Sequence, residues 1–158
     1  MTIHAWRIVK AKHAAAAFAE DSAKKYGGRW NSPGTGLVYA AGSASLAMLE
    51  MLVHLQSQEL LKRYVVFELR FDEALVTTVE MAALPANWRK SPPPAAVQRV
   101  GDAWVAGGGS CVLRVPSSVV PTEWNFLLNP VHPDFADIAI GPKVPVRFDP
   151  RLIKTSTS

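Results

Sequence analysis

The sequence has little cysteine, and Cys111 is its one cysteine. An internal disulfide and a cysteine-rich metal site are therefore excluded. The sequence also lacks an apolar run long enough to span a bilayer, and the N-terminus lacks the basic-then-apolar order of a signal peptide. We therefore expect a cytoplasmic protein that does not contact a membrane.

Charge of one sign is nowhere concentrated in the sequence. The net charge is +4, and the nearest approach to a basic cluster is Trp88-Arg89-Lys90 in a proline-rich segment. A chain that binds nucleic acid directly is expected to carry a basic stripe or patch, so we expect no such binding here. The histidines also lack an obvious pairing, which argues against an RNA-cleaving enzyme with histidine or lysine as acid and base.

Several common catalytic motifs are missing. The sequence contains no G-x-G-x-x-G, and Gly107-Gly108-Gly109 is not followed by the Lys-Ser/Thr of a phosphate-binding loop. No G-x-S-x-G surrounds Ser117-Ser118, and His132 and Asp134 lack the spacing of metal ligands. A dinucleotide fingerprint, a hydrolase elbow and a resident metal ion are therefore not expected.

The composition is that of a folded domain. Apolar residues make up 49% and charged residues 19% of the 158 residues, which excludes extensive disorder and allows one core. We expect a single domain over residues 1–158, with a polar tail that frays after about residue 152.

The hydrophobic patterns predict both strands and helices, without regular β–α–β alternation. Residues 65–71 alternate in the manner of a half-exposed strand, with Val65, Phe67 and Leu69 on one face. The class that fits this order is α+β. We expect further strands at 5–9, 37–40, 74–79, 110–115, 123–128, 138–140 and 144–148, and helices at 13–25, 43–58 and 95–105.

The segment Gly27 to Gly34 places Arg29 in a glycine-rich turn. Glycine allows positive φ and close approach of a ligand to the backbone, and an arginine there can grip a phosphate through its planar guanidinium. A structural arginine in an ordinary turn is the alternative.

The predicted helix is apolar nearly all round between Ser45 and Leu55, apart from Glu50 and His54. Leu46, Leu49 and Val53 form one of its faces, so we expect most of the helix to be buried. A buried carboxylate needs a partner, and Glu50 is therefore part of a structural ion pair, a cap to a neighbouring loop, or a carboxylate positioned for chemistry. His54 lies four residues on, at the spacing of a hydrogen-bond partner.

Tyr39 stands on a short apolar strand between Arg29 and Glu50 in the sequence. Taken alone, a tyrosine in such a strand belongs to the core. Beside an arginine and a carboxylate, it is also a candidate platform on which a flat ring stacks.

These motifs together resemble the RES domain toxins, which are named for an arginine, a glutamate and a serine. The resemblance runs from Trp6 to Leu152 and rests on several motifs in order: GGRWNSPG at 27–34, LEMLVHL at 49–55, LPANW at 84–88, GDAW at 101–104, RVPSSVVP at 114–121 and NFLLNPVHPDF at 125–135.

The resemblance implies a fold like that of the ADP-ribosyltransferases, similar to the diphtheria-toxin catalytic core, and activity on NAD⁺ as substrate. It also implies an Xre-type antitoxin partner that covers the active-site cleft. The family's arginine falls on Arg29, its glutamate on Glu50 and its serine on Ser117, with Ser118 as the neighbouring possibility. Tyr39 matches the position near the nicotinamide.

Arg7 and Asn125 lie in matching segments and are further candidates for binding NAD⁺. The resemblance implies that Glu50 stabilises positive charge on the ribose as the nicotinamide leaves, while Ser117 orients the ligand. The acceptor of the ribosyl group is left open between water, inorganic phosphate and a protein side chain. A non-catalytic module that binds a nucleotide or a partner is the other alternative.

Overall fold

One curled sheet organises the molecule. The computed structural model describes residues 1–153, in which eight strands form a sheet of order β4-β5-β6-β2-β1-β3-β7, with β8 also paired to β3. Only the β4–β5 pair is parallel. The strands are β1 Thr2–Lys10, β2 Val38–Ala41, β3 Tyr64–Asp72, β4 Val76–Thr78, β5 Val112–Pro116, β6 Trp124–Leu128, β7 Ala139–Ile140 and β8 Val144–Val146.

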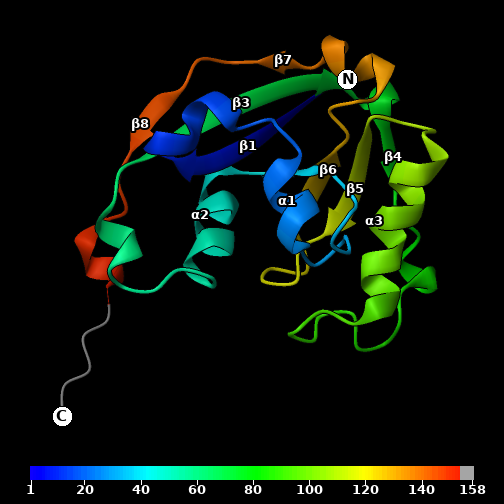
Figure 1. Ribbon diagram of the computed structural model, residues 1–158, viewed down its shortest axis with the longest axis horizontal. Helices are drawn as coiled ribbons and strands as arrows, with labels where there is room; N and C mark the ends of the chain where they lie inside the picture. Colours follow the sequence, from blue (N-terminus) through cyan, green and yellow to red (C-terminus); the bar gives the residue numbers. More distant parts are fainter. Residues whose placement is uncertain (154–158) are drawn as a thin grey trace.

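The sheet changes direction at the short strand β2. β1 and β3 pair along their whole length, from Thr2 opposite Asp72 to Lys10 opposite Tyr64, whereas β1 meets β2 at the single pair Trp6–Ala41. In Figure 1, β1 and β3 consequently run crosswise to β5 and β6. This bend gives the sheet a concave side, on which α2 and α3 lie.

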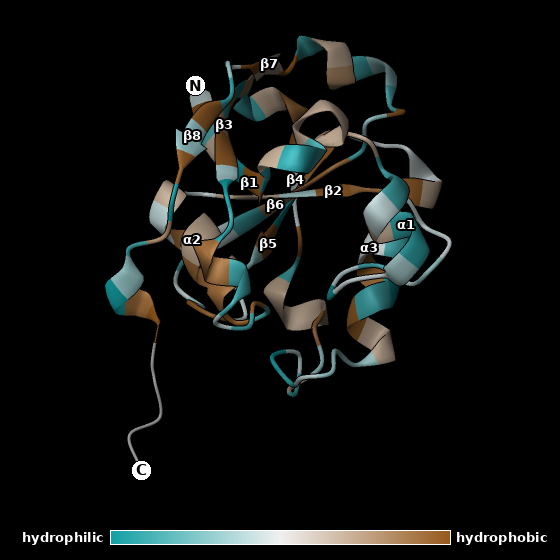
Figure 2. Ribbon diagram, turned by 60° about the vertical axis from the view of Figure 1, so that its left-hand side comes forward, coloured by the Kyte–Doolittle hydropathy of each residue, from teal (hydrophilic) through white to brown (hydrophobic). Residues whose placement is uncertain are grey.

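Three α-helices accompany the sheet within residues 1–153: α1 Asp21–Tyr26, α2 Ala44–Leu52 and α3 Ala95–Gly107. Ser43 caps α2 by accepting a hydrogen bond from the Leu46 N–H at 3.0 Å. Gly108 ends α3 with φ of 62°, in the left-handed region that glycine adopts without strain. Figure 2 shows the brown of hydrophobic residues on α2 and on the strands.

Separate clusters of buried side chains pack α2 and α3 against the same face of the sheet. Leu46 and Ala47 of α2 pack with Ile8 of β1, and Val97 of α3 packs with Leu113 and Leu127 of β5 and β6. The opposite face carries its own core, which includes the predicted inward residue Leu69 of β3. The α+β class is therefore confirmed.

Two helix predictions were too long. The predicted helix at 13–25 is divided into a 3-10 turn at Ala11–Ala16 and α1, because the chain bends at Ala17 and the Ala17 carbonyl accepts a hydrogen bond from Arg7. The predicted helix to residue 58 ends at Leu52. Its expected burial was also wrong for Leu49 and Val53, which are 42% and 58% exposed.

Alternation along the strand expected at 110–115 would put Cys111 on the same face as Leu113. Cys111 is fully buried, but it precedes β5 and packs on the opposite face from Leu113. Across residues 1–153, no helix is both long and apolar enough to cross a membrane. Ile153 packs against the α2 cluster, whereas the rest of the tail expected to fray, residues 154–158, lies outside the described residues.

Candidate active site

Glu50 lies on α2 and is held by two neutral donors. Its Oε1 atom accepts a hydrogen bond of 2.6 Å from Ser117 Oγ and one of 2.7 Å from Asn125 Nδ2. In the described part of the chain no cation lies within ion-pair distance of the Glu50 carboxylate. The alternative of a structural ion pair is therefore not what the structure contains, and Oε2 is left for other partners.

Ser117 is fully buried behind Glu50. Its Oγ atom also accepts the backbone N–H groups of Val119 and Val120, at 3.1 and 3.0 Å, so the same hydroxyl caps the turn that follows β5. Ser118 instead presents its carbonyl to Arg89 Nε at 3.0 Å. Of the two serines it is Ser117 that contacts Glu50, and its burial leaves no surface with which to touch a ligand directly.

Arg29 faces the same space as Glu50. Its Nη1 group donates to the carbonyls of Trp88 and Lys90, both at 2.9 Å, which fixes the guanidinium against the loop at residues 84–94. Burial lowers the pKa of Arg29, and the negative charge of Glu50 opposes that shift. The carboxylate and the guanidinium therefore sense each other's charge without forming a direct ion pair.

Tyr39 supports the Arg29 segment through its hydroxyl group. The hydroxyl donates to Asn31 Oδ1 at 2.5 Å and accepts the Trp30 N–H at 3.1 Å, and burial raises its pKa well above the usual value. A Cβ atom on Gly28 would lie 2.6 Å from this hydroxyl, so Gly28 is required for the close approach. Tyr39 is thus a structural tyrosine at its polar end, with its half-buried ring beside the site.

Helix α3 braces the same segment from behind. The Asp102 carboxylate accepts hydrogen bonds from Ser32 N at 2.9 Å and Ser32 Oγ at 2.6 Å, while Gln98 Nε2 donates to the Gly28 carbonyl at 3.0 Å. A Cβ atom on Gly101 would collide with the Trp30 carbonyl. These α3 residues were missed by the sequence analysis, although Gly101 and Asp102 belong to the GDAW motif that it singled out.

Arg7 does not join the group around Glu50. The register of β1 turns its side chain to the face opposite that of Tyr39, where Nε donates to the Ala17 carbonyl at 2.5 Å and Nη1 to the Tyr39 carbonyl at 2.8 Å. Burial lowers the pKa of Arg7 to about 10. Arg7 therefore links strand β2 to the turn at Ala17, on the other face of the sheet from the ring of Tyr39.

His54 follows the end of α2 and is exposed, and the hydrogen bonds of Glu50 come from Ser117 and Asn125 instead. No group of three or more histidine, cysteine, aspartate or glutamate side chains in residues 1–153 is arranged to hold a metal ion.

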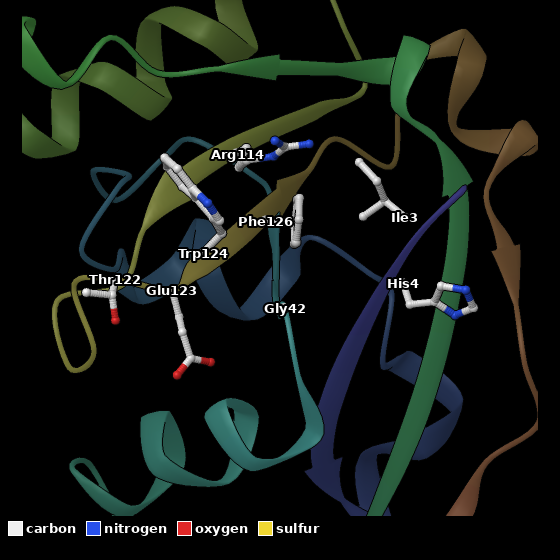
Figure 3. A pocket seen from close by; sticks show the side chains of 8 residues that line it. All are labelled: Ile3, His4, Gly42, Arg114, Thr122, Glu123, Trp124 and Phe126. Atoms are coloured by element: carbon white, nitrogen blue, oxygen red, sulfur yellow. The ribbon is translucent and has the colours of Figure 1, made fainter. Parts of the chain in front are cut away.

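A hollow of about 330 Å³ lies elsewhere, where β2 ends and leaves a gap between β1 and β6. Figure 3 shows Trp124 and Phe126 in it, with Glu123 pointing towards α2. Arg114 lies over both rings, at 6.0 and 5.7 Å from their centroids. Alternation along β6 turns these two aromatic residues to the face opposite Asn125, so this hollow is separate from the space at Glu50.

Comparison with known proteins gives one consistent result. The model of the RES domain matches residues 4–149. A protein named Toxin Res from Yersinia enterocolitica is 38% identical over 148 residues, which cover 93% of this chain and 97% of that protein. The Prs ADP-ribosylating toxin of a Sphingobium species is 39% identical and is covered to 99%, with 98% of this chain.

A solved structure shares the fold. The crystal structure of the M. tuberculosis MbcT–MbcA toxin–antitoxin complex contains a chain that superposes with a TM-score of 0.76. The match covers 97% of this chain and 87% of that one, at 20% sequence identity.

Proposed function

Since the chain belongs to the RES domain family of toxins, we propose that it cleaves the bond between nicotinamide and ribose in NAD⁺. The proposal depends on one observation: a carboxylate, Glu50, held by two neutral donors with one oxygen left over, beside the guanidinium of Arg29. Such a pair offers a negative group to the positive charge that develops on the ribose and a positive group to the pyrophosphate.

The chemistry of the bond matches this pair. As the bond breaks, its electron pair leaves with nicotinamide, which becomes neutral, and positive charge develops on the ribose carbon. A fixed carboxylate stabilises that charge, as in glycoside cleavage, and needs no acid partner because nicotinamide departs as a neutral molecule. Glu50 has this role in our proposal.

Arg29 takes the pyrophosphate of NAD⁺. Its Nη1 atom is occupied by two carbonyls, while its Nε and Nη2 atoms have no hydrogen-bond partner within residues 1–153. A guanidinium already fixed on one side loses less entropy when it binds a phosphate. Tyr39 lies between Arg29 and Glu50 in the sequence, and its side chain is half-buried. In this proposal its ring stacks on the nicotinamide.

The acceptor defines the biological outcome. Transfer to water or inorganic phosphate depletes NAD⁺ and is the version we favour. Transfer to a protein side chain is the second candidate, and the name of the Sphingobium relative, an ADP-ribosylating toxin, favours it. All versions share the cleavage step and the role of Glu50.

A toxin that consumes NAD⁺ must be silenced in its own cell. We propose a cytoplasmic protein paired with an Xre-type antitoxin that covers the cleft at Arg29 and Glu50. The shared fold with the toxin of a toxin–antitoxin complex supports a partner of this kind.

Release of nicotinamide from NAD⁺ tests the proposal, measured for the wild type beside Glu50→Gln, with and without inorganic phosphate. We expect release by the wild type alone, because the amide keeps the shape of Glu50 but not its charge. Dependence on phosphate would identify phosphorolysis. Equal release by both proteins would remove Glu50 from the mechanism, and ligand binding without turnover would favour the non-catalytic alternative.

A further inference from the structure

Asn125 occupies a position where the fold calls for an apolar residue. It lies on the central strand β6, between Ala41 of β2 and Val115 of β5, and shares a face with the fully buried Leu127. A polar side chain there is costly unless both ends of its amide are hydrogen-bonded.

Only one end of the Asn125 amide is paired. Nδ2 donates to Glu50 Oε1 at 2.7 Å, whereas Oδ1 is buried and has no hydrogen-bond partner in the described part of the chain. The residue is half-buried, and it leaves one buried acceptor unsatisfied while it makes one hydrogen bond to Glu50. Stability alone does not explain an asparagine in this position.

We infer that Asn125 is a positioning residue for Glu50, rather than a residue that binds NAD⁺, as the family resemblance had implied. This inference rests on the proposed function. Asn125 and Ser117 donate to the same oxygen from different strands, so together they fix both the position of the carboxylate and its rotation. Oε2 is thereby the oxygen presented to the substrate.

The two donors are not equivalent. Ser117 also holds the backbone of Val119 and Val120, so its removal disturbs the turn as well as Glu50. Asn125 has no other hydrogen bond in residues 1–153 through its side chain. Asn125 is therefore the position at which the orientation of Glu50 can be changed without undoing the local structure.

The test compares Asn125→Ala and Asn125→Leu with the wild type for kcat, KM for NAD⁺ and the melting temperature. We expect kcat to fall by about 10- to 100-fold, as for other misoriented catalytic groups. KM should stay within about twofold, because Asn125 does not touch the substrate, and Tm should be unchanged or raised, because the unsatisfied Oδ1 is gone.

Asn129 provides the matched control. It is a buried asparagine, whereas Asn125 is half-buried, and it directly follows β6. Its Oδ1 accepts a hydrogen bond from the Val131 N–H at 3.2 Å, away from Glu50. Asn129→Ala should lower Tm and leave kcat per folded molecule unchanged, which is the opposite pattern.

Three results would overturn the inference. Unchanged kcat in both Asn125 variants would mean that Ser117 orients Glu50 alone. A rise in KM at constant kcat would make Asn125 a direct NAD⁺ contact. Loss of kcat that follows the loss of folded protein in both variants would make its role structural. A wild type that does not cleave NAD⁺ would instead refute the proposed function, so the two failures are distinguishable.

Discussion

At the residue scale, Tyr39 combines a structural role at one end of its side chain with a proposed ligand-binding role at the other. Its hydroxyl forms hydrogen bonds with Asn31 and the Trp30 N–H, while its ring is the part that the proposed function gives to nicotinamide. Asn31 is fully buried and donates from Nδ2 to the carbonyls of Ala23 and Thr35. The hydroxyl is therefore part of the network that shapes the Arg29 turn.

Tyr39→Phe separates these functions. We expect the free energy of unfolding at neutral pH to fall by about 1–3 kcal/mol, because two buried polar groups lose their partner, while KM for NAD⁺ stays near the wild-type value. The raised pKa of Tyr39 also predicts that the wild type loses stability as the pH rises above about 10, its unfolded value. Denaturant titrations at pH 7 and pH 10.5 measure the free energy of unfolding of both proteins. An equally steep loss of stability with rising pH in Tyr39→Phe would contradict the role given to the hydroxyl.

At the element scale, helix α3 fixes the Arg29 turn although the two lie about 70 positions apart in sequence. The contact is made by Asp102 with Ser32, and by the absence of a side chain at Gly101. Burial raises the pKa of Asp102, but the hydrogen bonds from Ser32 and Thr35 outweigh it and hold the pKa below its usual value.

Asp102→Asn is expected to reduce the free energy of unfolding at pH 7 by about 1.5–3 kcal/mol, the range for hydrogen bonds to a charged group. The sign follows from the lowered pKa: the stabilisation is present above the unfolded value of 3.8 and is lost as the pH falls through the folded value. Unfolding curves at pH 7 and pH 3 should therefore differ more for the wild type than for the variant. If Asp102→Asn lowered the free energy of unfolding by the same amount at pH 7 and at pH 3, the role of the charge would be refuted.

The elements that the sequence predicted well are those defined by local patterns. Strand β3 follows from its alternation, and the start of α2 from the two candidate caps Ser43 and Ser45, of which the structure uses Ser43. The division of the helix at 13–25 depends on a distant group, Arg7, that takes up the Ala17 carbonyl. Such long-range contacts leave no periodic signal in the local sequence.

The candidate site was likewise predictable only in part from local sequence. Arg29 and Glu50 stand out because one is set among glycines and the other interrupts an apolar helix. The two donors to Glu50 come from residues 67 and 75 positions away, and only the structure gives their geometry. The resemblance named Ser117 and Asn125, but their placement behind the carboxylate is a finding of the structure.

At the scale of the whole molecule, the exposed apolar residues of α2 flank the proposed catalytic group. Leu49 and Val53 lie one position before and three positions after Glu50, and both are exposed. Apolar surface that stays exposed beside a functional group is typical of an interface with a partner protein. This placement agrees with a proposed antitoxin that covers the cleft.

Val53→Glu should therefore weaken inhibition while leaving NAD⁺ cleavage intact, because Val53 lies outside the group that holds Glu50. We expect inhibition to require at least about tenfold more antitoxin, since a charge at the centre of an apolar contact costs more than 1.4 kcal/mol. Titration of the partner into the NAD⁺ assay measures this, with Val131→Glu, exposed elsewhere on the molecule, as the control. Unchanged inhibition of Val53→Glu would show that the partner binds at a distance from this rim.

The loop at residues 84–94 is a place where a single cut in the chain would act on the proposed site. It holds Arg29 through the carbonyls of Trp88 and Lys90 and, through Arg89, the carbonyl of Ser118, so it joins the two halves of the proposed site. The loop contributes no strand to the sheet, and Arg89 and Lys90 are exposed to trypsin-like proteases. One cut there would leave the sheet paired but release Arg29, so we expect a single proteolytic event to abolish the proposed NAD⁺ cleavage in a molecule that is still folded.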